Sequence, residues 1–81
     1  MIRSIRKEHS NEIVKYVGVT ERIVMKYHYK SREHEKRCDY RKRKSIDVQS
    51  IRFNRLHSAY NNTQEFFRDK IDQGYEIVLE N

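Results

Sequence analysis

The chain has 81 residues, of which 37% are charged and 36% hydrophobic, and a net charge of +6. This length predicts one domain with a small core and excludes a second one. No apolar run reaches membrane-spanning length, and the N-terminal residues lack the apolar segment of a signal peptide. The single cysteine excludes an internal disulfide, and we therefore expect a cytoplasmic protein that does not bind membranes.

The positive charge is concentrated in one segment. Residues 30–44 carry a net +5, whereas residues 45–81 carry a net −2. The segment ends in four consecutive cations, Arg41 to Lys44, preceded by Tyr40. Such a cluster is typical of surfaces that neutralise phosphates, and a tyrosine beside it could stack on an exposed base. A solvated run of charge is the alternative interpretation.

The first ten residues give a weak pattern. Ile2 and Ile5 are three apart among basic residues, which fits a short first helix as well as it fits a frayed basic terminus. Ser10 or Asn11 could act as the N-cap of a following helix, with Glu12 in its first turn.

Residues 11–29 fit two interpretations, and the first is helical. It places a helix over residues 11–17, a turn at Gly18, and a second helix from Glu21 with Thr20 as its N-cap. One small core would then contain Ile13, Val17, Val19, Val24 and Tyr27.

On these residues and spacings, the segment resembles the helix-turn-helix of DNA-binding regulators. Val14 departs from the family's pattern, which usually has a small residue where the two helices cross. The resemblance implies a transcriptional regulator that reads double-stranded DNA with its second helix in the major groove, and a half-site reader of this size usually acts as a homodimer. The implied base-contacting residues are Thr20, Glu21, Arg22, Met25, Lys26 and Tyr29, and the phosphate-contacting residues are Lys30, Arg32, Lys36, Arg37, Tyr40, Arg41, Lys42, Arg43 and Lys44.

The second interpretation of this segment is extended. Apolar and aromatic residues at 23, 25, 27 and 29 alternate with their neighbours, which is the period of a half-buried strand. It predicts a β-hairpin over residues 12–30 in a small ββ(β)αβ fold. Lys26, His28 and Lys30 would then line one exposed strand face, and a β-face with Tyr27 and Tyr29 could bind RNA or single-stranded nucleic acid without specificity.

The basic segment and its neighbour also have local patterns. Residues 30–44 lack apolar periodicity but could form a solvated helix, capped by Ser31 and supported by a Glu33 to Arg37 pair, or a loop that orders on binding. Residues 46–53 alternate with one shift of phase, which predicts a strand with a bulge near Gln49 and Ser50.

The C-terminal part gives the clearest signal. Residues 59–71 have helical spacing, Asn61 or Asn62 can cap the helix, and Gly74 fits the left-handed position that ends it. Residues 75–79 alternate as a short strand. The predicted class is thus α+β: an N-terminal helix-turn-helix, a basic segment, a strand, a helix and a short C-terminal strand.

No residue pattern predicts an enzyme, a metal site or a cofactor. His34 and Cys38 are four apart, with His28 and His57 elsewhere, but the paired spacing of structural zinc sites is missing. The first functional hypothesis is therefore the DNA-binding regulator. The alternatives are a small α+β protein that binds and modulates or inhibits an acidic protein, and a non-specific binder of RNA or single strands.

Overall fold

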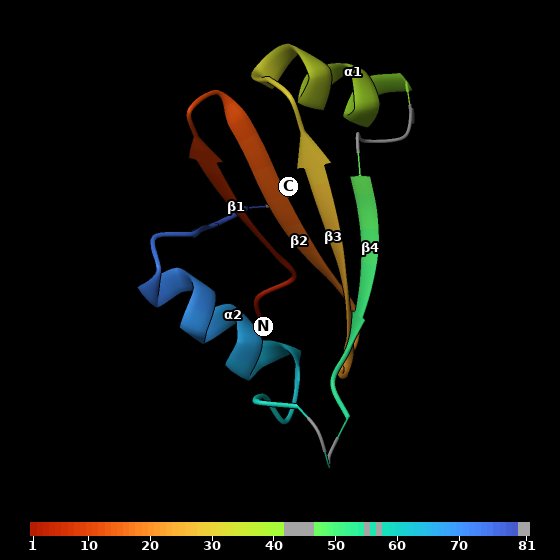
Figure 1. The fold of residues 1–81 in the computed structure, drawn as a ribbon, viewed down its shortest axis with the longest axis vertical. Coiled ribbons are helices and arrows are strands. Elements are labelled where there is room, and N and C mark those ends of the chain that lie inside the picture. Colours follow the sequence, from red (N-terminus) through yellow and green to blue (C-terminus); the bar gives the residue numbers. More distant parts are fainter. Residues whose placement is uncertain (42–46, 55, 57, 80–81) are drawn as a thin grey trace.

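The computed structural model describes residues 1–41, 47–54, 56 and 58–79. This part of the chain forms a five-stranded antiparallel sheet with strand order β4-β3-β2-β1-β5 and two helices (Figure 1). In chain order the elements are β1 (Ser4–His9), β2 (Glu12–Thr20), β3 (Ile23–Tyr29), α1 (Arg32–Arg41), β4 (Asp47–Arg52), α2 (Thr63–Asp72) and β5 (Glu76–Ile77).

The N-terminal half is a strand meander, so the predicted helix-turn-helix and the fold that began with it are wrong. β2 pairs with β3 from Ile13 opposite Tyr29 to Thr20 opposite Ile23. The extended interpretation of residues 12–30 describes this hairpin, although β1 adds a strand that the small fold predicted with it did not contain. The period of two in residues 23–29 therefore outweighs the helical spacing of Ile13 and Val17.

Ser10 and Asn11 form the turn between β1 and β2 and cap no helix. Their φ angles are 51° and 71°, and the flanking His9 and Glu12 are paired. A two-residue turn with both φ angles positive has the twist that joins adjacent antiparallel strands, and asparagine tolerates that conformation well. The polar pair that suggested a helix start thus closes a hairpin.

Gly18 lies in β2, opposite Val24, and not in a turn between helices. The register shifts between Gly18 and Thr20, which places a bulge just before the Glu21-Arg22 turn. A Cβ atom on Gly18 would lie 3.4 Å from the ring of Phe67 in α2. The glycine therefore marks a close approach of α2 to the sheet.

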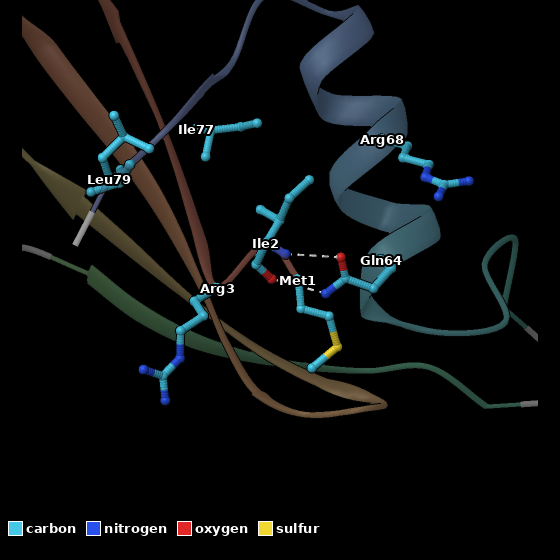
Figure 2. A pocket seen from close by; sticks show the side chains of 8 residues that line it. Met1, Ile2, Arg3, Gln64, Arg68, Ile77 and Leu79 are labelled. Atoms are coloured by element: carbon cyan, nitrogen blue, oxygen red, sulfur yellow. Dashed lines mark hydrogen bonds between the residues drawn. The ribbon is translucent and has the colours of Figure 1, made fainter. Parts of the chain in front are cut away.

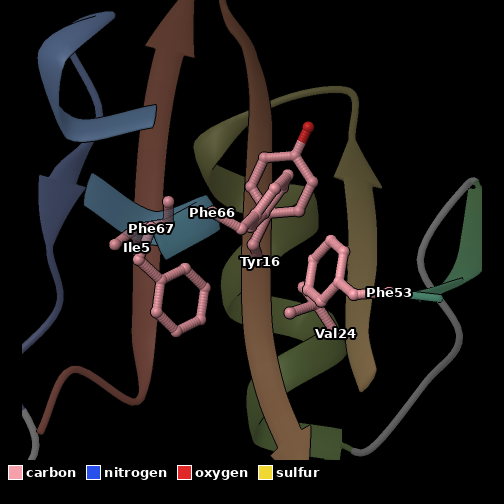
Figure 3. Packing of buried hydrophobic residues seen from close by; sticks show 6 residues of the cluster. All are labelled: Ile5, Tyr16, Val24, Phe53, Phe66 and Phe67. Atoms are coloured by element: carbon pink, nitrogen blue, oxygen red, sulfur yellow. The ribbon is translucent and has the colours of Figure 1, made fainter. Parts of the chain in front are cut away.

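The main core lies between the sheet and α2 (Figure 3). Phe67 and Ile5 are fully buried there, and the rings of Tyr16 and Phe66 meet edge to face with centroids 4.9 Å apart. The buried members of this cluster are Ile5, Tyr16, Val24, Phe53, Phe66 and Phe67.

A smaller cluster lies on the other face, under α1. It consists of Ile13, Tyr29 and Cys38, with Tyr27 packed against it. Ile13 and Val24 were predicted to share one core, but side chains alternate along a strand and the pairing puts these two on opposite faces. Val19, the third predicted member, is 59% exposed.

The C-terminal predictions agree with the structure except at their limits. Asn62 caps α2, and its side chain accepts a hydrogen bond from Glu65 N at 3.0 Å. Gly74 has a φ of +99° just after the helix, as predicted for the residue that ends it. The helix begins at Thr63, directly after the predicted cap at Asn62 and later than the first residue with helical spacing, and the terminal strand β5 contains only Glu76 and Ile77.

The N-terminus is fixed to the start of α2. Ile2 N donates to Gln64 Oε1 at 3.2 Å, and Gln64 Nε2 donates to Ile2 O at 2.8 Å (Figure 2). These two bonds hold the residues before β1 in place, so the predicted first helix and frayed terminus are both wrong. Neither helix in the described ranges is long and apolar enough to cross a membrane.

Candidate nucleic-acid interface

α1 carries most of the basic segment, and its sequence explains why it is helical. Ser31 Oγ accepts a hydrogen bond from His34 N at 3.1 Å, and His34 Nδ1 accepts one from Lys30 N at 3.1 Å. Glu33 and Glu35 lie in the first turn, where the helix dipole favours negative charge. The predicted helix is therefore confirmed for residues 32–41, but it is not wholly solvated, because Cys38 packs against the sheet.

Two ion pairs join α1 to β1. Glu35 accepts two hydrogen bonds from Arg6 of β1, at 2.8 and 2.9 Å, which raise the pKa of Arg6. Glu8 of β1 accepts from Arg32 Nε at 2.8 Å, and this bond lowers the pKa of the Glu8 carboxyl. α1 is thus clamped to β1 by two charge-assisted contacts.

The remaining acids of α1 are also matched. Asp39 lies 3.6 Å from Lys15 Nζ of β2, and Glu33 lies 3.9 Å from Arg37 on α1 itself. Lys30 and Lys36 have no carboxylate partner among the residues that the structure describes, and Lys36 is exposed. The acids of this end are therefore largely neutralised, whereas these two lysines retain uncompensated charge.

The predicted base-contacting residues do not form one ridge. Thr20, Glu21 and Arg22 lie at the β2–β3 turn, and Met25 and Lys26 are neighbours in β3 that point to opposite faces. Tyr29 is 4% exposed beneath α1, where burial first and nearby Asp39 second raise its pKa. An inserted recognition helix over residues 20–29 is therefore excluded.

The predicted phosphate-contacting residues fall into three groups. Arg32 and Arg37 are in ion pairs, whereas Lys30 and Lys36 are not paired with any described carboxylate. Tyr40 and Arg41 are the last two residues of α1. Lys42, Arg43 and Lys44 lie outside the described residues, as do His57 and the predicted strand residue Ile46.

Two lysines on the α2 face, Lys7 and Lys70, were not predicted to have a role. Lys70 Nζ lies 5.8 Å from the centroid of the Tyr16 ring and 5.9 Å from that of Tyr75, and Lys7 Nζ lies 5.6 Å from Tyr75. Lys7 also donates to Gln73 O at 2.9 Å, at the C-terminal end of α2, where a cation is favourable. These contacts give both lysines a structural role, and no local sequence pattern links positions so far apart.

The histidines and Cys38 do not form a metal site in the described part of the chain. Cys38 is buried on the side of α1 that faces the sheet, and His28 Nε2 lies 3.5 Å from Glu12. Within the described ranges, no three side chains of metal-binding type are grouped closely enough to hold an ion. Comparisons with protein-family models, with curated proteins and with solved structures found no match.

Proposed function

We propose that the protein binds nucleic acid, with double-stranded DNA as the expected target, through phosphate contacts made by Lys30, Lys36 and the basic run 42–44. The observation that carries the proposal is the pairing of the acids around α1. Glu8, Glu35 and Asp39 each face a cation, which leaves the lysines as the charge available to a polyanion. Phosphate neutralisation by lysine needs no inserted helix.

The burial of the tyrosines favours contact with a duplex backbone over base stacking. A single-strand platform on β3 would use Tyr27 and Tyr29, but Tyr29 lies in the cluster under α1 and Tyr27 packs against that cluster. Stacking requires an accessible ring face, whereas phosphates require only exposed cations. The proposed binding is therefore electrostatic and largely independent of sequence.

Regulation of transcription is not part of the proposal, because its predicted basis was the recognition helix. The proposed compartment is the cytoplasm, where a lone buried thiol such as Cys38 stays reduced. A homodimer is not required, since non-specific phosphate contacts do not depend on two half-sites.

The test is a fluorescence-anisotropy titration of a labelled DNA duplex at several salt concentrations. Lys30→Gln combined with Lys36→Gln removes two charges and retains most of the length of each side chain. We expect this variant to bind more weakly on every sequence, with the slope of log K against log salt reduced by about 2. Arg22→Gln combined with Arg52→Gln is the matched control, because it removes the same charge at the other end of β3 and β4.

The control pair separates a local site from general attraction to a basic protein. Equal losses of affinity in the two double variants would show that net charge alone drives binding. That result would contradict the assignment of the site to the α1 end. Binding of an acidic protein at that end, with no measurable affinity for the duplex at low salt, would favour the modulator or inhibitor alternative instead.

A further inference from the structure

β4 has an open edge. In the described part of the chain it pairs only with β3, and it forms one border of the sheet (Figure 1). Its residues Asp47 to Ser50 are all exposed, and Val48 is 41% exposed. Edge strands are usually protected by charged side chains, proline or a bulge. β4 has charges only at its two ends, Asp47 and Arg52, and it has neither proline nor the bulge predicted there. The edge can therefore accept another strand.

A cationic groove continues from the end of β4. It encloses about 560 Å³ between the β2–β3 turn and the residues that follow β4. Arg22 and Arg52 line it together with Thr20 and Asn54, and its apolar lining includes Ile23 and Leu56, which is 84% exposed. No acid lines the groove within the described ranges, and neither arginine has a carboxylate partner there.

Backbone hydrogen bonds fix both walls of the groove. Phe53 N donates to Arg22 O at 2.8 Å, and Thr63 N donates to Glu21 O at 2.8 Å. Thr20 Oγ1 accepts from Arg22 N at 3.2 Å. The turn that carries Arg22 is thus tied to the segment after β4 and to the start of α2, so a ligand would meet a preformed site.

We propose that β4 and this groove form a docking site for an extended acidic segment of another protein. The segment adds a strand beside β4, through backbone hydrogen bonds, and places a carboxylate against Arg22 and Arg52. An aliphatic side chain next to that carboxylate covers Leu56. The groove of this site lies at the opposite end of β4 from the proposed nucleic-acid surface, which lies at the α1 end of the sheet.

The positive charge of the groove and the open hydrogen-bonding edge of β4 favour an acidic peptide over a second copy of the chain or a nucleic acid. A second copy of the chain would bring the same two arginines and a second net charge of +6 to the interface, which disfavours self-pairing. A nucleic acid offers phosphates to the arginines but no peptide groups to the open strand. An acidic extended peptide offers carboxylates to the arginines and peptide groups to the open edge of β4.

The test is an NMR titration of the ¹⁵N-labelled full chain. The probe is a synthetic peptide of alternating Val and Thr with two Glu residues at one end, and the control peptide has Lys in place of Glu. We expect the Glu peptide to shift the amide signals of β4 and slow their exchange with solvent. Arg22→Gln with Arg52→Gln should weaken this binding about tenfold, and Lys30→Gln with Lys36→Gln should leave it unchanged.

Three results would overturn the docking site. These are equal shifts with the Lys peptide, shifts that avoid β4, and protection of β4 amides that appears on self-association without peptide. Displacement of the peptide from β4 by a DNA duplex would also assign the groove to nucleic acid. Because the two variant pairs are reciprocal controls, failure of the nucleic-acid proposal would leave the peptide result interpretable.

Discussion

The two faces of the sheet are held to their helices by different forces. α2 packs on the sheet through a cluster of six buried residues with aromatic rings in contact, whereas α1 shares a cluster of only three with the sheet and is fastened by ion pairs to β1 and β2. Salt does not screen apolar burial, but it weakens ion pairs that are exposed to solvent. The comparison indicates that α2 contributes most of the apolar core, while α1 is held largely by charged groups near the surface.

Truncation of the α2 core should give the largest effect. Phe67 is fully buried, so Phe67→Ala should lower the free energy of unfolding by about 4 kcal/mol through lost burial and a cavity. Cys38→Ala, its counterpart under α1, should lower it by about 1 kcal/mol. Urea denaturation of both variants measures the difference. Similar losses of unfolding free energy would contradict the proposed difference between the two faces.

Removal of one clamp should have a smaller, salt-dependent effect. Glu35 is largely buried in its bidentate contact with Arg6, so Glu35→Gln should cost about 1 kcal/mol of stability, and less at high salt. Glu33→Gln is the matched control, since its pair with Arg37 is exposed and longer, and it should change stability by less than about 0.5 kcal/mol. Thermal unfolding at low and high salt compares them. A cost that does not depend on salt would contradict the electrostatic clamp.

Acid should loosen α1 before α2, with the smallest effect on global stability. The pKa of Glu8 is lowered in the folded state by its bond to Arg32, so this bond stabilises the fold above the pKa of the unfolded chain, about 4.3. That contribution is lost as the pH falls through the lowered folded pKa. As the pH falls below the pKa of the unfolded chain, the hydrogen exchange of α1 amides should therefore accelerate more than the exchange of α2 amides, after both are corrected for intrinsic rates. Parallel changes in both helices would count against a separate clamp.

The sequence was most informative where one local pattern had one physical cause. The Asn62 cap, the helical spacing after it and Gly74 each act within a few residues, and they located α2 and its end. The alternation of residues 23–29 was equally local. It competed with Ile13 and Val17, whose separation of four residues fits one face of a helix and one face of a strand alike.

The N-terminal error came from features whose meaning depends on distant residues. Gly18 lies against the ring of Phe67, and nothing near Gly18 in the sequence shows that ring. Ser10 and Asn11 suit a helix cap and a hairpin turn equally. The partners of the charged residues, such as Arg6 with Glu35, follow from the packing of α1 on the sheet and could not be assigned before the fold was known.

The most direct test of the central claim is the map of NMR chemical-shift changes on adding a DNA duplex at low salt. The account predicts that the largest shifts occur between Lys30 and Lys44 and disappear together as salt is added. Largest shifts at the β2–β3 turn or along β4, or no shifts at low salt, would contradict the claim that the α1 end binds the phosphate backbone.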